Sequence, residues 1–218
     1  MKPVTKKQIA ILAGASIVIV LLLLANTKLP ENKEDVKNSE HAGTQTASIT
    51  SLVENAMSAL TAGQKSHIQK LEAATEVVTD KKAAYEQLIS TCDSLRQPVA
   101  AAYYMEKAAL ASPVEKNWKE AGDRYFMAIR FTKAEEHPLL YSKAMQCFEK
   151  VLELNPADLE TKINLASCYV EGSTDPMKGI AMLREIEKTD SNNVNLQLNF
   201  AFFSEKSGLV SMYPIASD

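Results

Sequence analysis

The sequence has few of the residues that build metal sites, disulfide frameworks and phosphate-binding loops. It contains 3 cysteines, 3 histidines and 7 glycines among 218 residues. The cysteines form no C-x-x-C pair, and an odd number does not complete a disulfide framework. The histidines occur in neither an H-E-x-x-H nor an H-x3-H spacing, and the glycines are scattered singly. These shortages argue against a metalloenzyme, a disulfide-stapled domain and a nucleotide-binding loop.

Two further absences bear on function. No pair of Asp or Glu residues invites a general acid–base assignment, because the acids are spread over the solvated faces of helices. A basic patch is also missing. The whole chain has a formal charge of −3 and residues 1–28 carry four lysines and no acid, which leaves −7 on residues 29–218. We therefore predict no catalysis, no cofactor, no metal and no nucleic-acid partner.

The composition favours helices around one sizeable core. Hydrophobic residues make up 46% of the chain and charged residues 23%, with only 8 prolines. The fold class expected is all-α.

An uninterrupted apolar run occupies residues 9–25, IAILAGASIVIVLLLLA. At 1.5 Å per residue this run spans about 26 Å, the short end of what crosses a bilayer. We predict an uncleaved transmembrane helix; a cleaved signal peptide is the alternative. The slight lysine bias favours residues 1–8 in the cytoplasm and the rest of the chain outside it. In a bacterium that places a single-pass protein in the inner membrane with its bulk in the periplasm.

Residues 26–46 are polar and lack an apolar period, which is typical of a flexible tether. Residues 47–81 then contain two amphipathic stretches with apolar residues at helical spacing. These helices either cover the end of the downstream core, which we favour, or bind a partner helix.

The rest of the chain repeats a spacing. Ala144, Phe148 and Val151 lie 12, 8 and 5 residues before Pro156. The same distances recur before Pro113 (Ala101, Met105, Ala108) and before Ser191 (Gly179, Leu183, Ile186). After each break a second pattern follows at offsets 0, 3, 4 and 7, with its fullest form in Trp118, Ala121, Gly122 and Tyr125. Each copy predicts a helix pair in which a small residue permits close approach and a larger one fills the core.

This pattern resembles the tetratricopeptide repeat (TPR) family, whose period of about 34 residues has the form W-x2-L-G-x2-Y…A-x3-F…P. The resemblance covers residues 82–208 and divides them into 82–114, 115–158, 159–193 and a partial copy at 194–208. The second copy has about ten extra residues near KAEEHPLL (133–140), which we expect at the turn between its helices. Residues 209–218, with Pro214 among them, are expected to be irregular. The chain is thus similar to single-span bacterial TPR proteins, apparently shortened at its C-terminal end.

The cysteines fit this register. Cys92 falls at a packing position and Cys168 beside one, so both are predicted to be core thiols. A Cys147–Cys168 disulfide is the alternative if the domain is periplasmic.

The resemblance implies an α-solenoid with an extended concave surface that binds a protein or peptide. It assigns to the groove a set of residues from the first helix of successive repeats: Lys116, Lys119, Asp123, Phe126, Met127, Ile163, Ser167, Val170, Leu198 and Phe202. Phe126, Ile163, Leu198 and Phe202 would form an apolar strip suited to an amphipathic or extended peptide. The Lys/Asn/Arg set with which some TPR domains grip a terminal carboxylate is incomplete, so we predict no such clamp.

The sequence therefore predicts a membrane-anchored TPR scaffold for protein–protein interaction. The alternatives are a self-associating structural protein of the envelope, which would be a homo-oligomer, and a shortened array without a foreign ligand.

The topology can be tested with a reporter fused after Asp218. A reporter that is active only outside the cytoplasm, such as alkaline phosphatase, should be active. A fusion that is active only when kept in the cytoplasm would reverse the predicted orientation.

Overall fold

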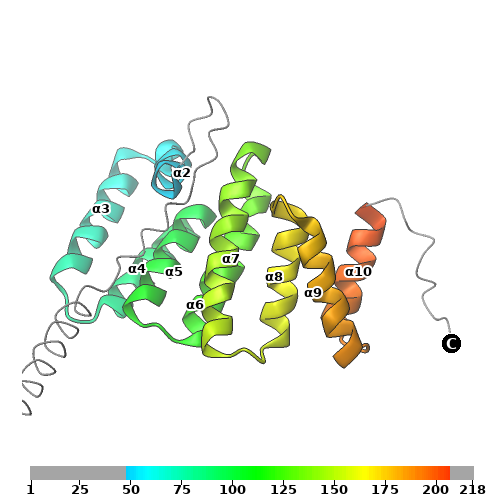
Figure 1. Ribbon diagram of the computed structural model, residues 1–218. Coiled ribbons are helices and arrows are strands. Elements are labelled where there is room, and N and C mark those ends of the chain that lie inside the picture. The colour runs from blue at the N-terminus through cyan, green and yellow to red at the C-terminus, as the bar shows by residue number, and fades with distance from the viewer. Residues whose placement is uncertain (1–47, 207–218) are drawn as a thin grey trace, which may run out of the picture. The chain divides into compact units, whose positions relative to one another are not determined.

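The computed structural model describes residues 48–206, and all of the regular secondary structure in that range is helical (Figure 1). The helices are α2 (Ile49–Ala56), α3 (Ala62–Val77), α4 (Lys81–Ser94), α5 (Pro98–Ala111), α6 (Glu115–Ala128), α7 (His137–Leu154), α8 (Leu159–Gly172), α9 (Pro176–Thr189) and α10 (Val194–Lys206). Three short 3₁₀ turns, η1 (Met57–Ala59), η2 (Ile129–Phe131) and η3 (Ala134–Glu136), lie between them. The predicted all-α class is confirmed for this part of the chain.

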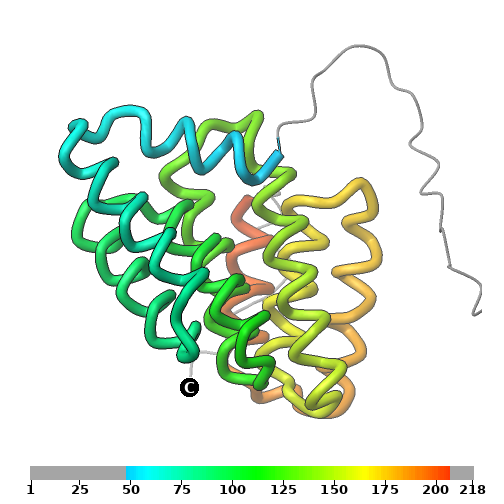
Figure 2. The backbone as a smooth tube through the Cα atoms, turned by 90° about the vertical axis from the view of Figure 1, so that its left-hand side faces the viewer, coloured from blue at the N-terminus to red at the C-terminus, as the bar shows by residue number. Residues whose placement is uncertain are grey.

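From α4 to α9 each helix packs against the next one in the chain, so that the helices form a row (Figure 1). Figure 2 views the same row from its α3 end, with α10 in red at the far end. At the near end, α3 packs on α4 and α2 packs on α5. Leu52, Val53 and Ile68 are buried in the same cluster as the residues of α4 to α8. Residues of the 47–81 segment therefore cover the end of the core, as we favoured.

Local sequence signals set the helix boundaries. Pro98 and Pro176 stand at the first position of α5 and α9, where the missing N–H costs no hydrogen bond. The Asp158 side chain accepts a hydrogen bond from the Thr161 amide and caps the start of α8. The helix starts at Glu115, Leu159 and Val194 coincide with the first residues of the segments 115–158, 159–193 and 194–208.

The buried residues form two clusters that meet at α8. Leu165 and Cys168 of α8 belong to the first cluster, while Ile163 and Ala166 belong to the second, with Leu196 of α10. Because α8 buries side chains on two sides, it is held between its neighbours as a middle member of the row.

Small residues set the distance between paired helices. A Cβ added at Gly122 of α6 would lie 2.5 Å from the Phe148 ring of α7. At Gly179 of α9 it would lie 2.4 Å from the Ala166 carbonyl oxygen of α8. Ala144 is fully buried. The ring and the backbone thus occupy the space that a larger residue would need.

The extra residues of the second pair are placed only partly as expected. They form η3 and the first turn of α7, which is 18 residues long against 14 in α5 and α9. The insertion therefore lengthens a helix as well as a turn.

The three cysteines are free and buried, so the alternative of a Cys147–Cys168 disulfide is wrong and the predicted core thiols are confirmed for Cys92 and Cys168. Between residues 48 and 206, none of the helices combines the length and the apolar character that crossing a bilayer requires. The predicted span 9–25 lies outside the described residues, as do residues 1–8, the tether 26–46 and the tail 209–218.

Gly179→Ala tests the helix spacing. The new methyl group would meet the backbone of Ala166 and Val170, which no rotamer change can relieve, so we expect a loss of about 1–3 kcal/mol in the free energy of unfolding. Gly63→Ala is the matched control, because nothing lies within 4 Å of the added Cβ and alanine favours a helix by up to about 1 kcal/mol. Thermal unfolding of the full chain, followed by circular dichroism, measures both. A Gly179→Ala variant that melts no lower than the wild type would contradict the spacing.

Candidate protein-binding groove

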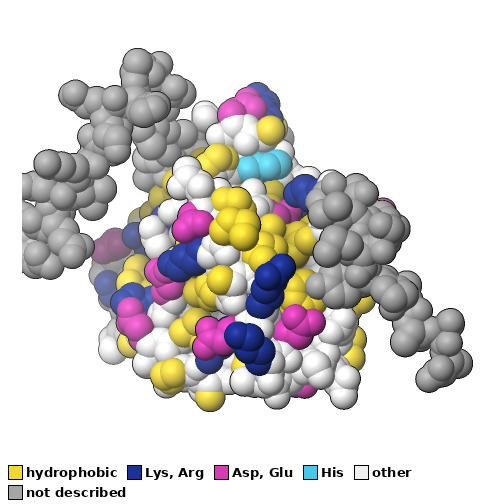
Figure 3. Space-filling model, turned by 45° about the vertical axis from the view of Figure 1, so that its right-hand side comes forward, with side chains coloured by type: hydrophobic (Ala, Val, Ile, Leu, Met, Phe, Trp, Pro, Cys, Tyr) yellow, Lys and Arg dark blue, Asp and Glu magenta, His cyan; other side chains and the backbone are white. Residues whose placement is uncertain are grey.

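A groove of about 620 Å³ is lined by residues of α6, α7, α8 and α10 and of the segment between α6 and α7. Its lining includes three of the predicted residues, Phe126 from α6 and Leu198 and Phe202 from α10. On the face shown in Figure 3, hydrophobic side chains gather beside Lys, Arg, Asp and Glu side chains. The groove lining thus combines Phe126 with two residues that lie at least 72 positions later in the sequence.

The apolar part of the groove is partly open to solvent. Leu198 is 62% exposed and Phe202 is 48% exposed. The Phe126 ring packs edge to face against Tyr141 of α7, with 6.0 Å between the ring centroids. Exposed Leu198 and Phe202 beside the half-buried Phe126 make a surface that gains from being covered.

Among residues 48–206, Glu171 is the one carboxylate that lines the groove, and its charge is compensated within the protein. Glu171 of α8 accepts a hydrogen bond of 3.2 Å from the Tyr141 hydroxyl. It also forms an ion pair with the Lys206 ammonium, at 3.1 Å. Burial, followed by the nearby Glu171 charge, raises the pKa of Tyr141, so its hydroxyl keeps its proton. The Lys206 ammonium also lies 5.7 Å from the Phe202 ring centroid.

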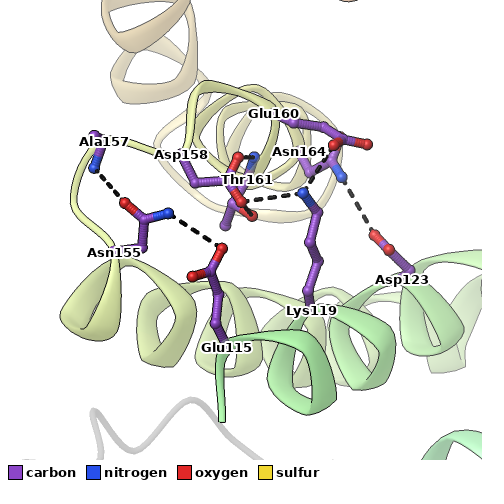
Figure 4. A network of polar contacts seen from close by, with 9 residues as sticks. All are labelled: Glu115, Lys119, Asp123, Asn155, Ala157, Asp158, Glu160, Thr161 and Asn164. Carbon is purple, nitrogen blue, oxygen red and sulfur yellow. Dashed lines mark hydrogen bonds and ion pairs between the residues drawn. The ribbon is translucent and has the colours of Figure 1, made fainter.

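Nearer the middle of the row, α6 and α8 are joined by a polar network (Figure 4). The Lys119 ammonium lies 3.0 Å from an Asp158 oxygen and 2.8 Å from a Glu160 oxygen. Beside it, the Asn164 amide donates a hydrogen bond of 3.2 Å to Asp123. The predicted groove residues Lys119 and Asp123 therefore have partners within the protein and hold two helices together.

The network shifts the pKa values of both aspartates. Burial acts to raise the pKa of Asp158, but hydrogen bonds from Lys119 and Thr161 outweigh it, and the pKa lies below its usual value. For Asp123, burial and the Glu160 charge raise the pKa above its usual value, against the opposing effect of Lys119 and Asn164. Loss of the Lys119 charge would therefore make both carboxylates harder to ionise.

Lys116 lies in a different place. It lines a second groove, of about 440 Å³, between α4, α5 and α6. There Arg124 forms ion pairs with Asp93, at 3.0 Å, and with Glu120, at 3.1 Å. Lys116 and Lys119 are thus not members of one cationic site.

Ile163 and Ser167 were predicted to lie on the groove surface, but both are buried. Ile163 is fully buried, because it packs with Leu183 and Phe200 in the second core cluster. Ser167 is 3% exposed, and its hydroxyl oxygen lies 2.6 Å from the Asn199 side-chain oxygen and 2.9 Å from the Ile163 carbonyl. Both residues join α8 to its neighbours, so the apolar strip lacks its predicted middle member.

The remaining predicted residues lie at the surface or near it. Met127 is 47% exposed, and Val170 is half-buried against the close approach at Gly179. Sequence reasoning missed part of the groove lining: Ile129, Arg130, Thr132, His137, Tyr141 and Asn199. Three of these, Ile129, Arg130 and Thr132, lie between α6 and α7, and His137 is the first residue of α7. Only His137 falls within the predicted insertion at 133–140, and the sequence did not indicate on which side of the row these residues lie.

The buried thiols are not arranged for attack on a substrate. Burial, aided by neighbouring acids, raises the pKa of Cys92 and of Cys147 to about 12, which favours the neutral thiol. Among residues 48–206, no three His, Cys, Asp or Glu residues lie close enough together to hold a metal ion.

No protein-family model matches the chain, and a search of curated proteins found no match.

Lys119→Met tests the polar network through its pH dependence. A folded-state pKa below the unfolded value means that ionised Asp158 stabilises the fold above about pH 4, and that this contribution is lost as the pH falls through the folded-state value. The variant should therefore be less stable than the wild type at pH 7, by about 1 kcal/mol or less, and the difference should shrink at pH 3.

Urea unfolding at the two pH values measures this difference. Lys116→Met is the matched control, because Lys116 has no ion pair within the part of the chain described, and it should change little at either pH. If the free energies of unfolding of Lys119→Met and the wild type differ as much at pH 3 as at pH 7, the network does not stabilise the fold through its charges.

Proposed function

We propose that the protein is a membrane-anchored TPR-type scaffold that binds another protein through the groove at α6, α8 and α10. In this proposal it recruits or organises partners and does not itself catalyse a reaction.

The repeat assignment is supported by contacts at the motif positions. Gly122 and Phe148 occupy the glycine and phenylalanine places of the TPR pattern, and they lie against each other. Gly179, at the place of the small alanine, lies against α8 in the same way. Because such pairs stack on their neighbours one after another, an α-solenoid is the architecture that we propose.

The membrane anchor is proposed from the sequence of residues 9–25 alone. With the lysine bias before the span, the proposed location is the bacterial inner membrane, single-pass, with the helix row on the periplasmic side.

The observation that carries the binding function is the exposure of Leu198 and Phe202 inside a hollow that also contains Phe126 and Tyr141. Scattered exposed apolar residues are normal, but a concave group of them between charged side chains is typical of a binding surface. Apolar side chains of a partner would cover Phe126, Leu198 and Phe202, which form the apolar floor of the groove.

A second candidate is self-association through α10. Val194 and Leu198 are 70% and 62% exposed on this helix, so a second copy could cover them. Light scattering on the full chain in detergent distinguishes the two, because self-association requires a stable oligomer.

The binding function can be tested by cross-linking and pull-down from membranes with the full chain. Leu198→Glu/Phe202→Glu should lose a partner that the wild type retains, since each change puts a charge into the apolar floor. Met177→Glu is the matched control, because Met177 is 69% exposed on α9 and does not line the groove. Equal recovery by all three proteins would count against the groove, and capture of only the protein itself would favour self-association.

A further inference from the structure

The groove has a charge that differs from that of the surrounding protein. Residues 48–206 contain 18 Lys or Arg and 22 Asp or Glu, a net charge of −4. In the groove lining the charged side chains are Arg130, Lys206 and Glu171, and Glu171 is held by Lys206 and Tyr141 with only 14% of its side chain exposed. Arg130 is exposed and has no carboxylate partner within the described range. The edge of the groove at Arg130 and Lys206, called the rim below, is therefore locally positive, although the described part of the protein is acidic.

The segment between α6 and α7 supplies this cation. Arg130 stands in η2, between Ile129 and the 71% exposed Phe131. The turn that follows is fixed by the Thr132 hydroxyl, which donates to the Ile129 carbonyl at 3.0 Å, and by the His137 ring, 3.3 Å from the Thr132 carbonyl. Four residues of the segment 129–137 thus line the groove, and Arg130 adds a charge at its edge.

Several polar side chains of the groove already have hydrogen-bond partners within the protein. The Thr132 hydroxyl donates to Ile129 and the Tyr141 hydroxyl donates to Glu171. The Asn199 amide donates to the Asn195 carbonyl at 2.8 Å, and its oxygen lies 2.6 Å from the Ser167 hydroxyl. An extended peptide would bring backbone N–H and C=O groups that need partners, and the groove offers few. A helix satisfies its own backbone groups and needs only apolar and charge contacts from the groove.

We propose that the groove takes one face of an amphipathic helix whose apolar side chains are flanked by carboxylates. A few apolar side chains of the helix enter the floor at Phe126, Leu198 and Phe202, and a carboxylate of the helix pairs with Arg130 at the rim. This inference rests on the proposed binding function and specifies the partner segment. Charge complementarity favours an acidic helix over a basic one, since the rim repels lysine and arginine.

Three labelled peptides of one length test the proposal by fluorescence anisotropy. The first is a helix with Leu and Phe at i, i+3, i+4 and i+7 and flanking Glu residues. The second has Lys in place of every Glu, and the third has a central Pro that breaks the helix. The protein is the full chain in nanodiscs of zwitterionic lipid, and empty nanodiscs give the background for each peptide.

The acidic helix should bind at least about fivefold more tightly than either of the other peptides, and its affinity should fall with added salt. Arg130→Gln should weaken it about three- to fivefold, the range of an exposed ion pair. Arg184→Gln is the matched control, because Arg184 is exposed on α9 and outside the groove lining. It should leave the affinity unchanged, whereas Leu198→Glu should abolish binding above background.

Equal or tighter binding of the Lys peptide would overturn the charge assignment, and equal binding of the Pro peptide would overturn the helical form. An affinity that Arg130→Gln leaves unchanged would also overturn the proposal. If these results occur while the membrane pull-down still depends on Leu198 and Phe202, the helix proposal fails and the groove function stands. If the pull-down shows no groove dependence either, the proposed function itself fails.

Discussion

The close approach of neighbouring helices at small side chains is the constraint on which the rest of the structure depends. Gly122 leaves room for the Phe148 ring, and Gly179 lets α9 approach the backbone of α8. Such contacts fix the distance of a helix from its neighbour in the row. The row that results keeps α6, α8 and α10 at related positions, although their residues are far apart in the sequence.

That arrangement produces two unlike regions, the Lys119 network and the groove. Around Lys119 the polar side chains bind one another and join α6 to α8, so this part is mainly structural. In the groove, at Phe126 and Phe202, the side chains are apolar and partly open, and η2 adds Arg130 at the rim. Residues of α6 and α8 thus stabilise the row at the Lys119 network and line an open surface at the groove.

Much of the fold could be predicted from the sequence because its signals are local. The spacing of Ala144 and Phe148 before Pro156 placed the helix boundaries, since a proline break and a packing period are properties of short segments. The apolar residues of the groove were partly predictable for the same reason. The burial of Ile163 was not, because it depends on how closely Leu183 and Phe200 from other helices pack around it. Nor was the pairing of Lys119, which needs Asp158 and Glu160 from 39 and 41 residues away.

The central claim is that the apolar part of the groove contacts another protein, and site-specific photo-cross-linking in cells tests it most directly. A photoreactive phenylalanine analogue is introduced at Leu198, and at Met177 as an equally exposed position outside the groove. The account predicts a distinct adduct with another protein from position 198 and none from position 177. The same adducts from both positions, or adducts of only the protein with itself, would contradict it.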